Sequence, residues 1–183
     1  MLTLWTVRPI SDYEILQRDG VYRTDPALVD EHRLTAYHWI ASELAKHTPP
    51  PPHASLPVWA WYHAHGANKP KPDLRKSGHL PKGERGVRIE FKIPKEMVLL
   101  SNFDGWHSVL NDWCFAPDDD EYEHYERLEQ TLPPDEFQSI KEQSWHNIFD
   151  LSLIPDPAIY EIQAVFWELR LDWVKKVDYF TAK

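Results

Sequence analysis

The sequence predicts a single α+β domain, residues 1–183, with a mainly antiparallel split sheet and flanking helices. Segments with the alternating pattern of half-buried strands are separated from segments with helical spacing. The regular strand–helix–strand rhythm that builds a parallel sheet is missing. The length of 183 residues matches one domain of ordinary size. We expect about five or six strands and three or four helices.

The first segment, residues 2–8, alternates between two faces and predicts a strand that Pro9 ends. A short helix follows, for which Ser11 and Glu14 have the spacing of a capping box and Gly20 is a C-cap candidate.

A second helix is predicted by Ala36, Ile40 and Leu44, which share one helical face, and it should run to about Lys46. Asp25-Pro26, further upstream, is typical of an N-cap followed by proline at the first helical position.

The middle of the chain predicts strands at 57–63, 87–93 and 97–100, of which 87–93 has the clearest alternation. Residues 66–86 contain Gly, Pro and Lys without an apolar period. They predict a long loop, and long loops inside compact domains are often functional.

The last third predicts a short helix at 105–113, a helix after Pro133-Pro134 and a strand at 160–169. Residues 171–180 predict a turn followed by a last strand or a short helix. The acidic run 118–126 is typical of a solvated face or a mobile loop.

Composition restricts the function. The chain has 20 Lys and Arg against 29 Asp and Glu, a formal charge of −9. This charge disfavours non-specific coating of nucleic acid and attachment to an anionic membrane surface. The single Cys114 excludes a disulfide framework, and its apolar setting favours an inert thiol. The chain has no apolar run of membrane-spanning length and no signal-peptide pattern, so we expect a cytoplasmic protein without a membrane partner.

Trp59, Trp61, His63 and His65 are spaced by two and would form one row on a strand. Such a row could be a stacking platform for a base, a nicotinamide or a sugar ring. The alternative is that both tryptophans belong to the core. A zinc site on the two histidines would need a third ligand such as His79, which no second motif fixes, so we expect no metal.

The loop that follows is basic. Residues 69–92 hold eight Lys or Arg and three acids, a charge of +5, which leaves −14 for the rest of the chain. Such an asymmetry could hold a pyrophosphate or a nucleic-acid end, with Arg75 as the best bidentate phosphate contact. The alternative is a solvated loop paired with the acidic run.

Near the last long strand, Glu161 and Gln163 are two residues apart and could hydrogen-bond a ribose. The alternative is that they are solvated residues where the strand begins. Glu168, on the opposite face, could be the buried partner of a basic residue. The glycine-rich nucleotide fingerprints and the motifs of common hydrolases and zinc proteases are missing.

The chain has several distinctive segments, among them Leu4-Trp5-Thr6 with Pro9, Trp59-Ala60-Trp61-Tyr62, Pro72-Asp73-Leu74-Arg75 and Ile162 to Glu168. In these segments it resembles a bacterial and phage family of unknown function, and the resemblance covers nearly the whole chain.

The order of elements is more distantly similar to ADP-ribosyltransferase domains, the closest being toxins that modify DNA bases. This resemblance implies an enzyme that uses NAD and transfers ADP-ribose to a macromolecular acceptor, either nucleic acid or protein. It places Thr6 or Arg8 on NAD, Trp61 or Tyr62 on the nicotinamide, and Arg75 with Arg8 on the phosphates.

The resemblance also puts the catalytic glutamate near Gln163, where glutamine has no charge to stabilise an oxocarbenium-like ribose. Glu161 could replace it after a shift of two residues on the same face. We therefore expect Glu161 and Gln163 to be the catalytic pair. The alternative is a non-enzymatic protein- or nucleotide-binding module.

Overall fold

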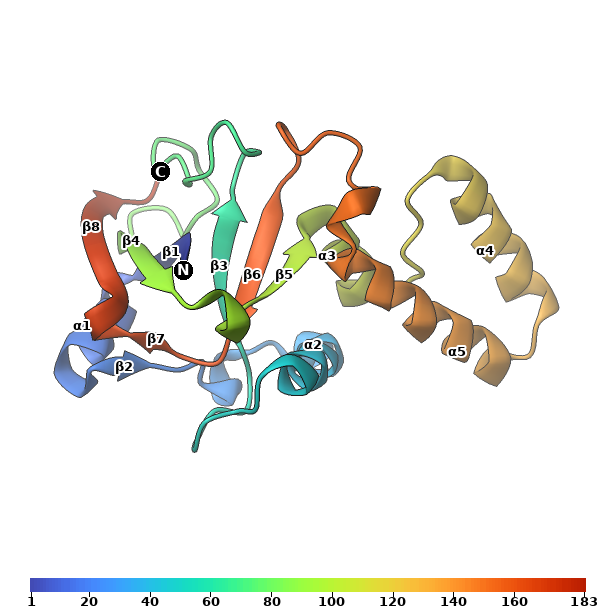
Figure 1. Ribbon diagram of the computed structural model, residues 1–183, viewed down its shortest axis with the longest axis horizontal. Helices are drawn as coiled ribbons and strands as arrows, with labels where there is room; N and C mark the ends of the chain where they lie inside the picture. The colour runs from blue at the N-terminus through green and yellow to red at the C-terminus, as the bar shows by residue number, and fades with distance from the viewer.

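The computed structural model describes all 183 residues and confirms the α+β class and the mainly antiparallel sheet. A six-stranded antiparallel sheet has the order β5-β6-β3-β1-β4-β8, and β2 pairs with β7 in a separate ribbon (Figure 1). The strands are β1 (Leu2–Pro9), β2 (Val21–Tyr22), β3 (Val58–His63), β4 (Arg85–Ile93), β5 (Leu99–Asn102), β6 (Ile162–Phe166), β7 (Leu169–Arg170) and β8 (Val174–Thr181). The helices are α1 (Ile10–Asp19), α2 (Leu34–His47), α3 (Phe103–Leu110), α4 (Asp119–Thr131) and α5 (Pro134–Trp145).

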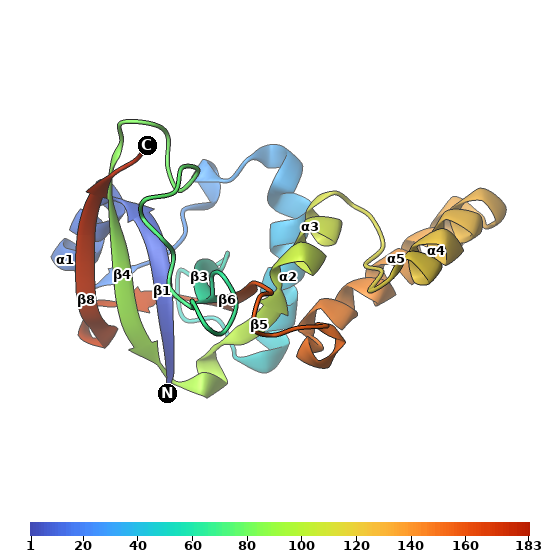
Figure 2. The same cartoon turned by 90° about the horizontal axis from the view of Figure 1, so that it is seen from above.

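The sheet opens between its two central strands. β1 pairs with β4 along its whole length, from Leu2 opposite Ile93 to Pro9 opposite Gly86. It pairs with β3 only through Trp5 opposite Trp61. Figure 2 shows β1, β4 and β8 as one group of strands, turned away from the group of β3, β6 and β5. The backbone of β1 beyond Trp5 therefore lies apart from β3.

Two apolar cores cover the two faces of the sheet. On one face, Leu16 of α1 packs with Leu4 and Phe91. On the other, Ile40 and Leu44 of α2 belong to one cluster with Trp106 of α3, Trp145 of α5 and Val165 of β6. Burying such side chains stabilises each layer by about 1.5–3 kcal/mol per residue.

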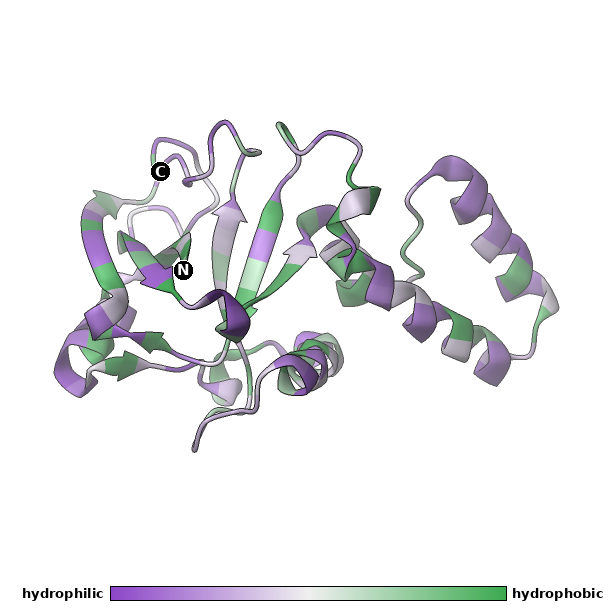
Figure 3. Cartoon of the chain, in the orientation of Figure 1, coloured by the Kyte–Doolittle hydropathy of each residue, from purple (hydrophilic) through white to green (hydrophobic).

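The α4–α5 hairpin extends away from the sheet in both views (Figure 1, Figure 2). It has a small core of its own, centred on Cys114, Tyr125 and Phe137. The acidic run is therefore the start of a solvated helix, not a loop, and Asp118 caps this helix by accepting from the Glu121 amide at 2.9 Å. Figure 3 shows α4 as mostly hydrophilic.

Several predicted boundaries are wrong, each for a local reason. The capping box at Ser11 does not form, because α1 starts at Ile10 directly after β1 and Pro9 is its N-cap. Asp25 caps only a 3₁₀ turn at Pro26–Leu28, and α2 begins at Leu34.

The strand predicted at 97–100 lies at Leu99–Asn102, since residues 95–97 form a 3₁₀ turn after Pro94. The helix predicted from 105 begins at Phe103, where the Asn102 side chain accepts from the Asp104 and Gly105 amides.

Other expectations from the sequence are confirmed. Gly20 ends α1 with a left-handed backbone at φ 74°. Cys114 is buried. Glu168 accepts from Arg23 Nη2 at 2.6 Å, so it does pair with a basic residue, but it is half-buried.

None of the helices is long and apolar enough to cross a membrane.

Candidate functional site

The main cleft lies where β1 and β3 separate, and its volume is about 410 Å³. Its walls come from six parts of the chain: β1, β3 and β6 of the sheet, the helices α2 and α3, and the long loop after β3. The polar and aromatic residues that line the cleft include Thr6, Arg8, Arg33, Tyr37, Trp59, Trp61, His79, Phe103, Trp106 and Gln163. The cleft therefore joins residues that are far apart in the sequence.

A second cleft of about 500 Å³ continues from the first. The two share four lining residues, Arg8, Arg33, Tyr37 and Trp59. The second cleft has acidic residues along its lining, among them Asp12, Asp25 and Asp30. The result is an elongated groove with an aromatic end, an acidic end and two guanidinium groups where the ends meet.

The aromatic end consists of rings in contact. Trp59 lies 4.7 Å from Trp106, centroid to centroid, and Trp61 lies 5.0 Å from Phe103. Both tryptophans of β3 are half-buried, so they belong to the core and to the wall of the cleft at once. Planar ligands stack well on rings that are already fixed by such contacts.

Arg8 is held in place by several groups around it. Its Nε donates to Thr6 Oγ1 at 3.2 Å, and its Nη1 lies 3.4 Å from the Tyr22 hydroxyl and 3.8 Å from Asp12. The guanidinium lies 5.0 Å from the Tyr22 ring centroid. Arg33 lines the same junction and is exposed. Arg8 and Arg33 thus both line the junction of the two clefts, and guanidinium groups suit a diphosphate, which they can bind bidentately.

Several polar atoms at the cleft are buried without a hydrogen-bond partner. They are Trp59 Nε1, Gln163 Oε1 and the Oγ of Ser101, which lies opposite Gln163 in the β5–β6 pair. An unpaired buried polar atom costs about 1–3 kcal/mol.

Burial raises the pKa of the Tyr37 phenol, with nearby Arg33 and Arg8 acting in the opposite direction. Tyr37 is therefore a neutral hydrogen-bonding group at the junction, and it adds no negative charge beside the guanidinium groups.

Four of the predicted site residues meet in this cleft, and three do not. Thr6, Arg8, Trp61 and Gln163 line it. Tyr62 points to the opposite face, because consecutive strand residues alternate, and it stacks on His63 at 4.2 Å.

Arg75 and Glu161 are the other two. The Arg75 side chain is 85% exposed and binds Asp73 in a separate loop pocket. Glu161 precedes β6, does not line the cleft, and lies 3.2 Å from His65 Nδ1.

The predicted aromatic and imidazole row is interrupted by a shift in register after Trp61. Trp59 and Trp61 share the cleft, whereas His63 stacks on Tyr62 and His65 turns to Glu161. No group of three His, Cys, Asp or Glu side chains is arranged to hold a metal ion.

Four further residues line the cleft that no sequence pattern indicated as site residues: Arg33, Tyr37, Phe103 and Trp106. The last two lie three apart on α3, so their spacing signals one helical face. Arg33 and Tyr37, at the start of α2, are four residues apart, a spacing that also places two side chains on one helical face. Nothing in the sequence shows that these two faces meet across β3.

Together the fold and the groove define an α+β domain with a ligand cleft at the split of an antiparallel sheet. A family model described as a domain of unknown function (DUF3841) matches residues 3–175, and the chain therefore belongs to this family. Comparison with the curated proteins and with the solved structures gave no match. Membership of a family of unknown function is thus confirmed, while its bacterial and phage origin stays a prediction.

Proposed function

We propose that this domain binds NAD in the cleft between β1 and β3 and uses the site as an ADP-ribosyltransferase does. One observation carries the proposal: Thr6 and Arg8 of β1, Trp61 of β3 and Gln163 of β6 line a single cleft. These residues come from the strands on which the resemblance to ADP-ribosyltransferases places NAD contacts.

The groove suits the parts of a dinucleotide in order. The nicotinamide would stack at the aromatic end, near Trp61 and Phe103. The diphosphate would bind Arg8 and Arg33 at the junction. The adenosine would extend into the second cleft, where Asp25 and Asp30 can accept hydrogen bonds from ribose hydroxyls.

The transfer breaks the bond between the ribose C1′ and the nicotinamide nitrogen, and nicotinamide leaves with the bonding electrons. The acceptor then attacks C1′ and loses a proton. Gln163 can hydrogen-bond a ribose hydroxyl and orient the sugar. Its amide carries no charge to stabilise the oxocarbenium-like ribose, so we expect slower transfer than a carboxylate would give.

A second candidate is a nucleotide-binding module without turnover. It is favoured by the uncharged side chain at Gln163 and by the position of Glu161 outside the cleft lining. The two candidates share the ligand and differ only in whether nicotinamide is released.

Calorimetric titration with NAD, with nicotinamide release followed in the same sample, separates them. Binding with release supports the transferase, and binding without release supports the nucleotide-binding module. We expect Arg8→Ala to weaken NAD binding about tenfold or more, because hydrogen bonds to charged groups contribute about 1.5–3 kcal/mol.

Arg18→Ala, an exposed arginine on α1 outside both clefts, is the matched control and should bind NAD as the wild type does. The proposal would be overturned if the titration gave no heat at millimolar NAD, or if Arg8→Ala and Arg18→Ala lost NAD affinity equally.

A further inference from the structure

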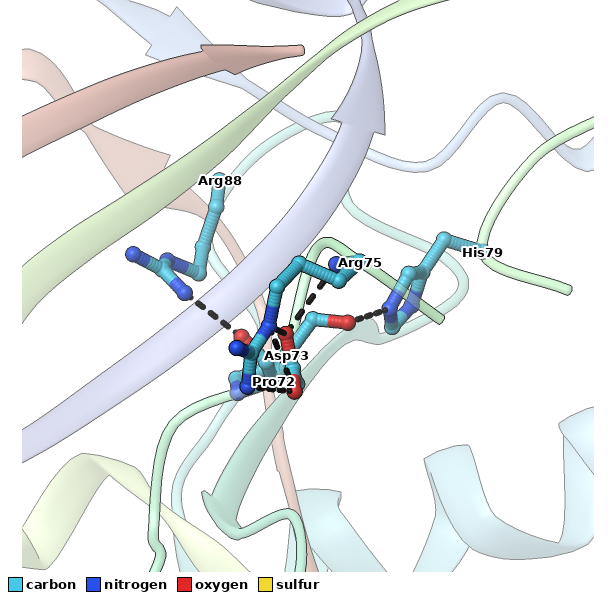
Figure 4. Close-up of polar contacts among 5 residues, drawn as sticks. All are labelled: Pro72, Asp73, Arg75, His79 and Arg88. Carbon is cyan, nitrogen blue, oxygen red and sulfur yellow. Dashed lines mark hydrogen bonds and ion pairs between the residues drawn. The ribbon is translucent and has the colours of Figure 1, made fainter. Parts of the chain in front are cut away.

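A second pocket, of about 820 Å³, lies between the long loop after β3 and strand β4. It shares no lining residue with the cleft at the split of the sheet. The two are nevertheless neighbours, because His79 of the cleft wall contacts the carbonyl oxygen of Asp73 through Nε2 at 2.9 Å (Figure 4). A ligand in the loop pocket would therefore lie next to the cleft.

The loop pocket is built from fixed groups. Arg88 donates to the carbonyl oxygen of Pro72 and to Asp178, which anchors the loop to β4 and β8 (Figure 4). Arg75 binds Asp73 through Nε and Nη2, and this pairing holds the pKa of the Asp73 carboxyl well below its usual range. The one acid of the pocket is thus already neutralised by a partner.

The lysine side chains of the loop pocket have no ion-pair partner. Lys69, Lys71 and Lys76 line the loop pocket, are exposed, and form no ion pair within the chain. With Arg75 and Arg88 they make five cationic residues around one acid. Since residues 69–92 carry +5 and the rest of the chain −14, a polyanion is attracted to this face and repelled elsewhere.

His65 adds a hydrogen-bonding group at the pocket. Its Nδ1 lies 3.2 Å from Glu161, and its Nε2 is buried without a partner. Glu161 therefore fixes the orientation of the imidazole, as carboxylates commonly do for functional histidines. The buried Nε2 is thus an unsatisfied polar group beside the loop pocket.

We propose that the loop pocket binds the phosphate backbone of single-stranded nucleic acid. Cations spaced along an open pocket match phosphates spaced along a strand. A flexible single strand also allows a base to reach the neighbouring aromatic cleft. A rigid duplex would bring further phosphates against the acidic remainder of the chain. The inference goes beyond the proposed function and does not depend on NAD binding.

The test is fluorescence anisotropy of the full chain with a labelled single-stranded oligonucleotide of mixed sequence at several salt concentrations. We expect binding that weakens with salt, with a log–log slope of about −2 to −3 for three or four phosphate contacts. The triple variant Lys69→Glu, Lys71→Glu, Lys76→Glu should bind about tenfold more weakly or worse. These lysines are exposed and unpaired, so the melting temperature should change little.

The matched control is Lys95→Glu, Lys175→Glu, Lys183→Glu, which makes the same charge change at exposed lysines outside the loop pocket and outside residues 69–92. An equal loss of oligonucleotide affinity in both triple variants would show a general charge effect and overturn the proposal. Undetectable oligonucleotide binding at low salt, tighter binding of the duplex, or equal competition by inorganic polyphosphate would overturn it as well. Arg8→Ala should keep oligonucleotide binding, which separates this test from that of the NAD proposal.

Discussion

The hydroxyl of Thr6 donates a hydrogen bond of 2.9 Å to the carbonyl oxygen of Trp59, across the point where β1 and β3 separate. The Thr6 hydroxyl oxygen also accepts a hydrogen bond of 3.2 Å from Arg8 Nε. One side chain, only 3% exposed, thus links the two halves of the sheet and orients the guanidinium at the junction of the clefts.

Thr6→Val should therefore lower the free energy of unfolding by about 1–3 kcal/mol, because it leaves the Trp59 carbonyl and Arg8 Nε without this partner. It should also weaken NAD binding, since Arg8 loses its anchor. Urea unfolding and NAD titration measure the two effects. Thr6→Ser keeps the hydroxyl, so its NAD affinity should stay near that of the wild type. If Thr6→Ser and Thr6→Val weaken NAD binding equally, the hydroxyl does not orient Arg8.

Gly66 joins the loop after β3 to the segment before β6. A Cβ at Gly66 would lie 1.9 Å from the Ala158 carbonyl oxygen, and its φ is +77°. Gly66→Ala should cost about 3 kcal/mol or more, because the backbone of 156–159 must move. Gly83→Ala is the matched control: its φ is +86° and nothing lies within 4 Å of the added Cβ, so only about 1 kcal/mol is expected. If urea unfolding showed equal losses of unfolding free energy for Gly66→Ala and Gly83→Ala, Gly66 would not pack against residues 156–159 as described.

The pH dependence of stability should contain a contribution from His63. Burial lowers the pKa of His63 below its ordinary value of 6.5. The unfolded chain regains the ordinary pKa, so below about pH 6.5 it binds a proton that the folded chain does not. The free energy of unfolding should therefore fall as the pH drops from about 7 to about 5. His63→Gln should reduce this slope in urea unfolding, and an unchanged slope would contradict the burial of the imidazole.

Gln163→Glu should raise the rate of nicotinamide release about tenfold or more, because it places a carboxylate in the cleft where positive charge develops on the ribose. Steady-state release from NAD at saturating concentration is the measurement. Glu161→Gln is the control, since Glu161 lies outside the cleft lining, and its NAD affinity should not change. A Gln163→Glu variant that binds NAD but releases no more nicotinamide than the wild type would remove residue 163 from the reaction.

The sequence alone predicted much of the sheet. The alternation at 87–93 and the aromatic segment 57–63 correspond to β4 and β3, because half-buried strands follow a period of two. Helix starts were predicted less well. Ser11 has the spacing of a capping box, but Pro9 ends β1 so abruptly that the helix begins before Ser11 can cap it.

The candidate site was predicted in part, and the misses have physical causes. Thr6, Arg8, Trp61 and Gln163 lie on strands whose order brings them to the cleft. Tyr62 was wrongly predicted to line the cleft, because its neighbour Trp61 takes the cleft face and consecutive strand residues alternate. Arg33 and Tyr37 depend on how α2 packs across β3, which is a tertiary relationship that no local pattern records.

The most direct test of the central claim is a crystal structure of the chain grown with NAD. We predict density for the dinucleotide in the groove, with its diphosphate within hydrogen-bonding distance of Arg8 and Arg33 and its nicotinamide beside Trp61. NAD bound elsewhere on the surface, or an empty groove at millimolar NAD in crystals that leave the cleft open, would contradict the account.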